Sequence, residues 1–336
     1  MLNFDEERFL ASQRGALAHA QGLRDAVAHH IAGGGDSLFF LGAGGAGILM
    51  EPAVALLSRR STFATFVQAP AELMALGSAH LTARSLVVVP SRSGDTAESL
   101  EVLEYCQRVG ATVLALTGTP GSPLGERADL NFTNPVADDN SSESFYLQSL
   151  LIALAVLDVR GEATDYAAVL AELAALPELL LEAKRSFESR APEVAAAIAA
   201  ASYHLIIGAG STWPEAFYYG MCILEEMQWI RTRPVHAAHF FHGPLELVEP
   251  GVSCLLFKGE DGSSALVERV EQFLVEYGAT STIIDTAQIA PGLSQHVRSM
   301  ISPIILSTVL ERVSAHLEVM RDHPLTTRRY YRRVSY

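Results

Sequence analysis

The feature that most constrains the fold is a pair of short apolar segments that end in glycine-rich turns. Residues 37–41, Ser-Leu-Phe-Phe-Leu, run into Gly-Ala-Gly-Gly-Ala-Gly at 42–47 and then into a helical pattern. The segment His204–Ile207 ends in a similar turn at 208–211, Gly-Ala-Gly-Ser. A buried strand followed by a tight turn and a helix opens a βαβ unit. The spacing of about 170 residues is far above solenoid periods and predicts two duplicated α/β domains.

Further strands support this interpretation in both halves of the chain. The apolar strand Ser85–Pro90 leads through a short loop into the helical pattern Ala97–Val109, and Ser253–Phe257 is a comparable strand in the second half. Short apolar strands that alternate with helices indicate parallel sheets. We therefore expect an α/β protein of two tandem domains, each a parallel sheet flanked by helices in three αβα layers. Ligands of such sheets bind at the carboxyl ends of the strands.

Two long helical patterns set the expected domain limits. One opens the chain near residues 4–31, and the other, rich in Ala and Leu, covers Phe145–Ala201. We place the first domain, with its N-terminal helix, at 1–185 and the second at 186–322. Residues 323–336 then form a basic and aromatic tail.

Composition narrows the possible partners and the compartment. A net charge of −14 over 336 residues argues against nucleic acid, which is held chiefly by clustered Lys and Arg. The three cysteines, Cys106, Cys222 and Cys254, have no paired spacing and suggest neither disulfides nor a thiolate zinc site. The acidic N-terminus does not resemble a signal peptide, and no uninterrupted apolar run, Leu147–Leu157 included, is long enough to span a membrane. We expect a cytoplasmic protein.

The loop at 91–96, Ser-Arg-Ser-Gly-Asp-Thr, is the strongest candidate for ligand binding. It follows a buried strand and opens a helix, so the hydroxyls of Ser91, Ser93 and Thr96 can converge on a phosphate with backbone N–H groups. A helix N-cap is the alternative explanation, but one cap would not require three hydroxyls. We therefore favour phosphate binding.

The glycine-rich turn at 42–47 also lets the backbone approach an anion, which makes Gly44 and Gly45 candidate substrate contacts. A dinucleotide site is a less favoured alternative. The glycines do not follow a clean GxGxxG pattern, and no acidic residue ends the next expected strand, Thr62–Val67.

Acidic and imidazole side chains gather between residues 213 and 247. Glu225 and Glu226 precede three histidines spaced by three, His236, His239 and His242. A carboxylate and an imidazole can divide proton-transfer work. Two alternatives stay open: the histidines could bind a metal, although no supporting carboxylate pattern is clear, and the acidic pair could be a solvated helix face.

The tail is the third candidate region. Its last nine residues contain Arg328, Arg329, Arg332 and Arg333 together with three tyrosines, in an otherwise acidic chain. The tail is either solvated or folds over a site and supplies a guanidinium to an anionic substrate.

Together these motifs resemble the sugar isomerase (SIS) domain family, in particular tandem-domain proteins related to the isomerase half of glucosamine-fructose-6-phosphate aminotransferase. The loop matches the family pattern S-x-S-G-[DE]-T. The resemblance implies that the sugar phosphate binds Ser91, Ser93 and Thr96 with the amides of Arg92 and Gly94. It also implies a ligand role for a serine that opens a helix, which corresponds here to Ser141.

The same resemblance implies catalytic roles in the second domain. Glu226 corresponds to the general base and His242 to the ring-opening histidine, and their separation by sixteen positions is kept. Phe241 replaces the lysine before His-Gly-Pro-Leu, and Ile223 replaces the catalytic lysine. The second change argues against ammonia-dependent synthesis of glucosamine 6-phosphate.

The segments EEMQWIR and HPLTTRRYYRRVSY are most similar to fructosamine 6-phosphate deglycases. This resemblance implies hydrolysis of a 6-phosphofructosyl-amino acid to glucose 6-phosphate and free amino acid, with no metal and no organic cofactor. It also implies a homodimer with sites near the subunit interface, and a tail arginine, taken as Arg332, at the substrate. An aldose–ketose isomerase and a noncatalytic sugar-phosphate sensor are the alternatives. Neither nucleic acid nor membrane is an expected partner.

Overall fold

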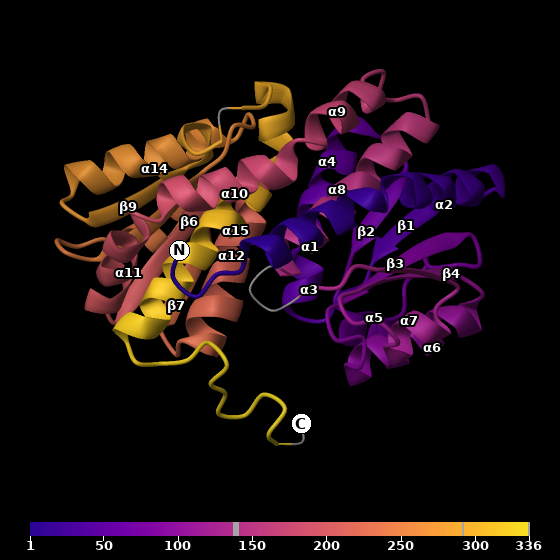
Figure 1. Ribbon diagram of the computed structural model, residues 1–336, viewed down its shortest axis with the longest axis horizontal. Coiled ribbons are helices and arrows are strands. Elements are labelled where there is room, and N and C mark those ends of the chain that lie inside the picture. The colour runs from indigo at the N-terminus through magenta and orange to yellow at the C-terminus, as the bar shows by residue number, and fades with distance from the viewer. Residues whose placement is uncertain (137–140, 291, 335–336) are drawn as a thin grey trace. The chain divides into compact units, whose positions relative to one another are not determined.

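The computed structural model describes residues 1–136, 141–290 and 292–334 and divides into two compact units (Figure 1). One unit is formed by Glu6–Glu178. The other starts at Leu179 and includes the first five residues of the chain, Met1–Asp5. Each unit is built on one parallel sheet.

The first unit has a five-stranded sheet of order β2-β1-β3-β4-β5. All neighbouring strands run parallel. The central strand β3 is buried along its full length, as expected for a strand covered on both faces. The strands are β1 (Ser37–Phe40), β2 (Ala64–Val67), β3 (Ser85–Ser91), β4 (Thr112–Thr117) and β5 (Leu130–Thr133).

Helices cover both faces of this sheet (Figure 1). Val87 and Val89 of β3 pack with Val102 and Leu103 of α6, while the alternate residue Val88 is buried on the opposite face. One face carries α5 (Pro70–Leu76), α6 (Ala97–Val109) and α7 (Pro123–Arg127). The remaining helices of the unit are α1 (Glu6–Ala18), α2 (Ala20–Ala32), α3 (Gly45–Ile48), α4 (Glu51–Arg60), α8 (Ser141–Val159) and α9 (Tyr166–Leu173).

Helix α8 is the apolar centre of the first unit. It contacts α1, α2 and α4. By length and composition it could cross a membrane, and 83% of its apolar window is buried inside the structure. A helix that is apolar all round is buried in this way when it forms the core of a folded domain.

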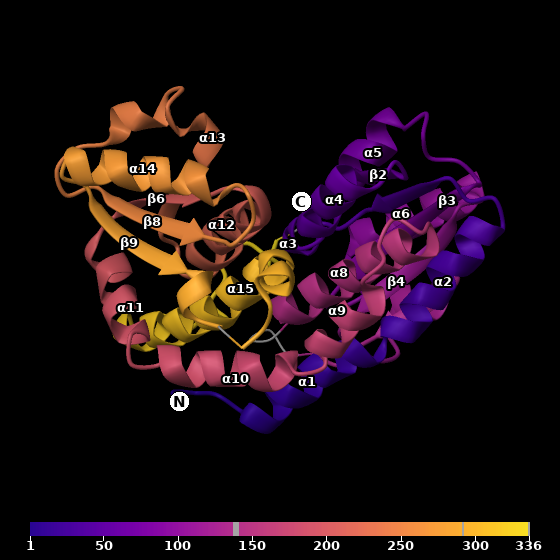
Figure 2. The ribbon, with the colours of Figure 1, turned by 90° about the horizontal axis from the view of Figure 1, so that it is seen from above.

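The second unit has a four-stranded parallel sheet of order β7-β6-β8-β9. Figure 2 shows α14 on one face and α11 and α15 on the other. Leu205 and Ile207 of β6 pack with α14, whereas Ile206 packs with α11 and α15. The strands are β6 (Tyr203–Gly208), β7 (Arg231–His236), β8 (Ser253–Lys258) and β9 (Thr280–Asp285). The helices are α10 (Leu176–Phe187), α11 (Ala191–Ala200), α12 (Trp213–Tyr218), α13 (Ala237–Phe240), α14 (Ser264–Glu276) and α15 (Gln295–Met320).

The expected architecture of two parallel sheets in αβα layers is therefore confirmed. The expectation of one opening helix over 4–31 is wrong, because two helices meet at His19. The strands β5, β7 and β9 were not expected. Each lies at the edge of its sheet, where side chains are half exposed and the sequence shows no continuous apolar run.

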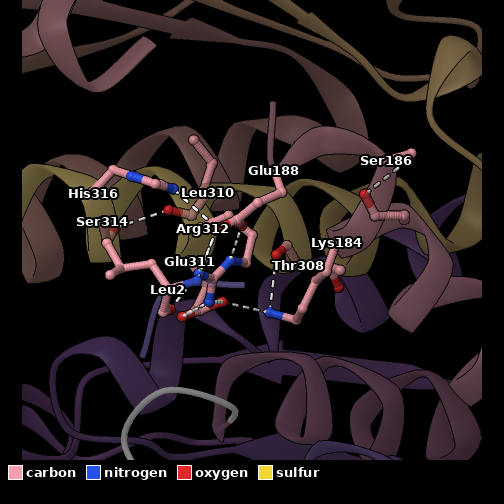
Figure 3. Close-up of polar contacts among 11 residues, drawn as sticks. Leu2, Lys184, Ser186, Glu188, Thr308, Leu310, Glu311, Arg312, Ser314 and His316 are labelled. Atoms are coloured by element: carbon pink, nitrogen blue, oxygen red, sulfur yellow. Dashed lines mark hydrogen bonds and ion pairs between the residues drawn. The ribbon is translucent and has the colours of Figure 1, made fainter. Parts of the chain in front are cut away.

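A buried ionic cluster joins the N-terminus to α10 and α15 (Figure 3). Arg312, fully buried, donates from Nε to Glu188 at 2.7 Å, and Leu2 N donates to the same carboxylate at 2.9 Å. Buried Lys184 pairs with Glu311 at 2.8 Å. Burial alone would raise the pKa of Glu188, but hydrogen bonds led by that from Arg312 lower it to about 2. The buried charges are paired with one another, as buried groups require, and the backbone of Leu2 ties the first residues of the chain to this cluster by hydrogen bonds.

Candidate active site

The backbone of the loop at 91–96 is fixed by hydrogen bonds and by one glycine. Ser91 is the last residue of β3, and its Oγ accepts from Gly94 N at 3.1 Å. Gly94 has φ +65°, and a Cβ there would lie 2.3 Å from Oγ of Ser122. Its carbonyl accepts from Leu124 N at 2.9 Å. Only glycine fits this position, so the loop is held in one shape before any ligand arrives.

The hydroxyl of Thr96 is not used to cap the following helix. Thr96 occupies the N-cap position of α6 in an extended conformation, yet its side chain makes no capping hydrogen bond to the described residues. Ser93 and Thr96 are half-buried. The carbonyl of Arg92 accepts from Gly118 N and Thr119 Oγ1, both at 3.0 Å. The N-cap alternative therefore does not account for Thr96.

The glycine-rich turn lies at the same edge of the sheet, because β1 pairs in parallel with β3. A Cβ on Gly42 would lie 2.4 Å from Gly47 N, so the strand end and α3 approach too closely for any side chain. Gly44 has φ +55° with open space beside it, and Gly45 starts α3. The backbone is thus accessible at the two positions expected to contact substrate.

Ser141 is the first residue of α8 and is buried. Asn140, beside it, lies outside the described residues. Further along the helix, Ser144 accepts from Asn134 Nδ2 at 2.6 Å, and Gln148 contacts the ring of His19 at 3.0 Å. These polar side chains of α8 are engaged within the first unit.

Glu51 is a candidate that sequence reasoning missed. It opens α4 shortly after the glycine-rich turn and is half-buried. Burial raises the pKa of Glu51 to about 7. An acidic residue next to Pro52 at the end of an apolar run was the available signal. This carboxyl can gain or lose a proton near neutral pH.

In the second unit, the corresponding edge of the sheet is filled by the protein itself. Asp261 follows β8 and accepts from Ser211 N at 2.8 Å and from Ser263 N at 2.9 Å. Burial would raise the pKa of Asp261, but these hydrogen bonds lower it. The Asp261 carboxylate thus accepts hydrogen bonds from N–H groups that could otherwise bind an anionic ligand. The repeat therefore does not supply two equivalent anion sites.

The two neighbouring glutamates have different surroundings. Both lie in the π-helix η3 (Tyr219–Met227), a geometry often found at functional sites. Glu225 accepts from N and Oγ1 of Thr232, at 3.2 and 2.7 Å, and so braces the start of β7. Glu226 instead accepts from Arg328 Nε at 2.9 Å. Ile223, at the position of the family's lysine, packs against the apolar core.

Glu226 lines a pocket of about 890 Å³ within the second unit. Tyr203 and Arg231, the first residues of β6 and β7, place this pocket at the amino edge of the sheet. Tail residues 328–331 form part of its wall. The tail is therefore folded against the candidate base.

Individual tail arginines occupy different positions. The guanidinium of Arg329 lies 3.8 Å from the ring centroid of Trp229. The backbone of Trp229 has a φ of +56°, which is unusual for a residue other than glycine. Arg332 is exposed, lies 5.7 Å from the ring centroid of Tyr331, and is not among the pocket residues. Arg328 donates a hydrogen bond to Glu226. Tyr336 lies outside the described residues.

The structure does not bring His242 to Glu226 within one chain. Glu226 precedes β7, whereas His242 is exposed in the turn that follows α13, beyond the other end of that strand. A six-residue strand spans about 20 Å. The sixteen-residue spacing therefore separates these two groups instead of pairing them.

The other histidines are structural in part. His236 caps α13 by accepting from Ala238 N at 3.1 Å, and its ring lies 5.7 Å from that of His239. Burial, followed by the neighbouring His239, lowers the pKa of His236. Within the described ranges, no group of three or more His, Cys, Asp or Glu side chains could hold a metal ion.

The chain resembles known proteins over most of its length. Residues 34–158 match the model of the SIS domain. The fructosamine deglycase FrlB of Bacillus subtilis (strain 168) is 28% identical over 307 residues, which cover 90% of this chain and 93% of that protein. The fructoselysine 6-phosphate deglycase of Escherichia coli (strain K12) is 27% identical over 248 residues, 74% of this chain and 71% of that protein.

A solved structure supports the same grouping. The crystal structure of a candidate phosphosugar isomerase from Salmonella typhimurium LT2 has a TM-score of 0.88 at 25% identity and covers 94% of this chain and 97% of that one. Two parallel αβα units of this kind are tandem SIS domains. The chain is therefore similar to SIS-domain proteins over most of its length, and it is an enzyme.

The raised pKa of Glu51 should make the stability of the fold depend on pH. Because the pKa of Glu51 rises from 4.5 to about 7 on folding, the folded state binds more protons than the unfolded state between these values. The free energy of unfolding therefore falls as pH rises through this window. Relative to Glu51→Gln, the wild type should lose about 2 kcal/mol between pH 5 and pH 8 in urea unfolding, after allowance for partial exposure.

The matched control is Glu72→Gln, which removes an exposed carboxylate from the first turn of α5. Its difference from wild type should be the same at both pH values. A constant difference for Glu51→Gln as well would contradict the assignment.

Proposed function

We propose that this enzyme hydrolyses a 6-phosphofructosyl-amino acid to glucose 6-phosphate and the free amino acid. The observation that carries the proposal is the placement of Glu226 in a pocket with arginines of the folded tail. The names of the fructosamine and fructoselysine 6-phosphate deglycases support it. We place the reaction in the cytoplasm, with no metal or organic cofactor.

The phosphate of the substrate binds the loop at 91–96 in this proposal. The support is that the loop is preshaped by Gly94 and that the Thr96 hydroxyl is not committed to capping. Ser91, Ser93 and Thr96 donate to the phosphate with the Arg92 and Gly94 amides, and Ser141, Gly44 and Gly45 add contacts. Binding energy from this remote group then holds the reacting carbons in position.

Glu226 acts as the base. It takes a proton from C1 of the open-chain adduct, which gives an enaminol, and a proton returned to C2 gives an aldimine. Water adds to the aldimine carbon, and the carbon–nitrogen bond breaks to release glucose 6-phosphate and the amine. An isomerase would use the same transfer between C1 and C2 on a free sugar phosphate.

His242 assists opening of the sugar ring. Because Glu226 and His242 lie beyond opposite ends of β7, one chain does not supply both groups at one place. We propose a homodimer in which the histidine turn of one chain completes the site of its partner. Two chains then form two equivalent sites.

Glu226→Gln should bind substrate but lose at least about 100-fold in kcat, because the amide cannot accept the C1 proton. Release of glucose 6-phosphate from 6-phosphofructosyl-lysine is measured through a coupled dehydrogenase, with fructose 6-phosphate as the comparison substrate.

The matched control is the neighbouring Glu225→Gln, whose carboxylate braces Thr232 and should be dispensable for chemistry. Full activity in Glu226→Gln would refute the base assignment. Turnover of fructose 6-phosphate alone by the wild type would favour the isomerase, and no turnover of either substrate would favour a sensor.

Ser93→Ala should weaken substrate binding about tenfold, because one charge-assisted hydrogen bond to the phosphate is lost. Calorimetric titration with the 6-phosphofructosyl adduct measures this change. The unphosphorylated adduct is the control: its weak binding should be the same in both proteins. If the phosphorylated adduct binds Ser93→Ala as tightly as wild type, the loop is not the phosphate site.

Shared sites predict complementation between two inactive variants. Equal mixtures of Glu226→Gln and His242→Ala chains, unfolded and refolded together, should recover about a quarter of wild-type activity, since half the dimers carry one intact site. Glu226→Gln mixed with a chain carrying both substitutions should recover none. A monomer in light scattering, or no recovery from the first mixture, would count against sites shared between chains.

A further inference from the structure

Arg328 holds Glu226 by a well-defined contact inside the second unit. Its Nε donates to Glu226 Oε1 at 2.9 Å, while NH1 donates to the carbonyls of Leu325 and Thr327 at 2.6 and 3.0 Å. The Arg328 side chain is 17% exposed and that of Glu226 34%. A guanidinium tethered in this way is more strongly localised than in a loose surface ion pair.

The pocket around this pair favours an anionic group. Among the described residues, four arginines and two glutamates line it, although the whole chain has a net charge of −14. Arg329 is held against the ring of Trp229, whose other neighbour is the ring of His323. The volume of about 890 Å³ is sufficient for the amino-acid part of an adduct.

The contact has a chemical consequence for the proposed base. A guanidinium that donates to a carboxylate stabilises its negative charge, so the pair keeps Glu226 a weaker base until it opens. A substrate that carries its own carboxylate offers Arg328 a partner of the same charge and shape. A substrate without a carboxylate does not.

We propose that Arg328 determines specificity by exchanging partners. It pairs with Glu226 before substrate binds and then moves to the carboxylate of the substrate's amino-acid part, which releases Glu226 for proton transfer. This inference rests on the proposed function and assigns to Arg328 the recognition of the carboxylate that the amino-acid part of such a substrate carries. Recognition of a group remote from C1 is thereby coupled to the chemical step.

The test compares two adducts that differ only in the carboxylate, 6-phosphofructosyl-glycine and 6-phosphofructosyl-methylamine. The wild type should prefer the glycine adduct at least about tenfold in kcat/KM. In Arg328→Met, kcat/KM should fall about tenfold for the glycine adduct and rise for the methylamine adduct, because Glu226 is then released without a substrate carboxylate. Arg328→Lys, which keeps the charge, should restore part of the preference.

The control is Arg333→Met, which removes a tail arginine that does not line the pocket and should keep the wild-type preference. Thermal unfolding of each variant checks that the fold is retained. If Arg328→Met has the same ratio of kcat/KM for the two adducts as the wild type, the proposal is overturned. This holds whether both kcat/KM values fall together or neither changes. A lower rate for the methylamine adduct would overturn the release of Glu226.

A binding measurement separates this inference from the proposed reaction. If the wild type releases glucose 6-phosphate from neither adduct, the proposed reaction fails. Calorimetry then decides the role of Arg328. Tighter binding of the glycine adduct by wild type, lost in Arg328→Met, supports a carboxylate contact, whereas equal binding of both adducts, or none, overturns it.

Discussion

The parallel pairing of β1 with β3 is the constraint on which the first unit's candidate site depends. It places the ends of both strands at one edge of the sheet, so the glycine-rich turn and the serine-rich loop face the same side. Gly42 and Gly94 then fix the two turns, because a Cβ at either position would collide with neighbouring atoms. Glycine here sets shape and not flexibility, and the polar groups are in place before a ligand binds.

The second unit has the same architecture, but its candidate functional groups lie at a different edge of the sheet. Asp261 fills the turn after β6 with a carboxylate, so the N–H groups there are already satisfied. The opposite, amino edge of that sheet instead carries Glu226 and the folded tail. One unit thus carries the candidate anion site, while the other offers a carboxylate and arginines at a different edge. Fold symmetry alone therefore does not locate the chemistry.

The sequence predicted the parts whose signals are local. Helix α6 has the expected bounds, Ala97–Val109, and the central strands appear as continuous apolar runs. The edge strand β7 was missed because its sequence, Arg-Thr-Arg-Pro-Val-His, is largely polar. Glu51 was missed because its raised pKa comes from burial, which a sequence pattern does not report. Which arginine meets Glu226 depended on how the tail folds, and the basic cluster alone did not distinguish Arg328 from Arg332.

Sequence spacing also has a limit that Glu226 and His242 illustrate. A separation of sixteen positions would allow two side chains to meet if the chain turned back between them. Here the intervening residues contain the strand β7, which is held extended by its pairing with β6, and the chain does not turn back. A given distance along a chain can therefore reflect a fixed separation in space. If both groups act on one substrate, a symmetric dimer is the simplest assembly in which Glu226 of one chain and His242 of the other lie at the same site.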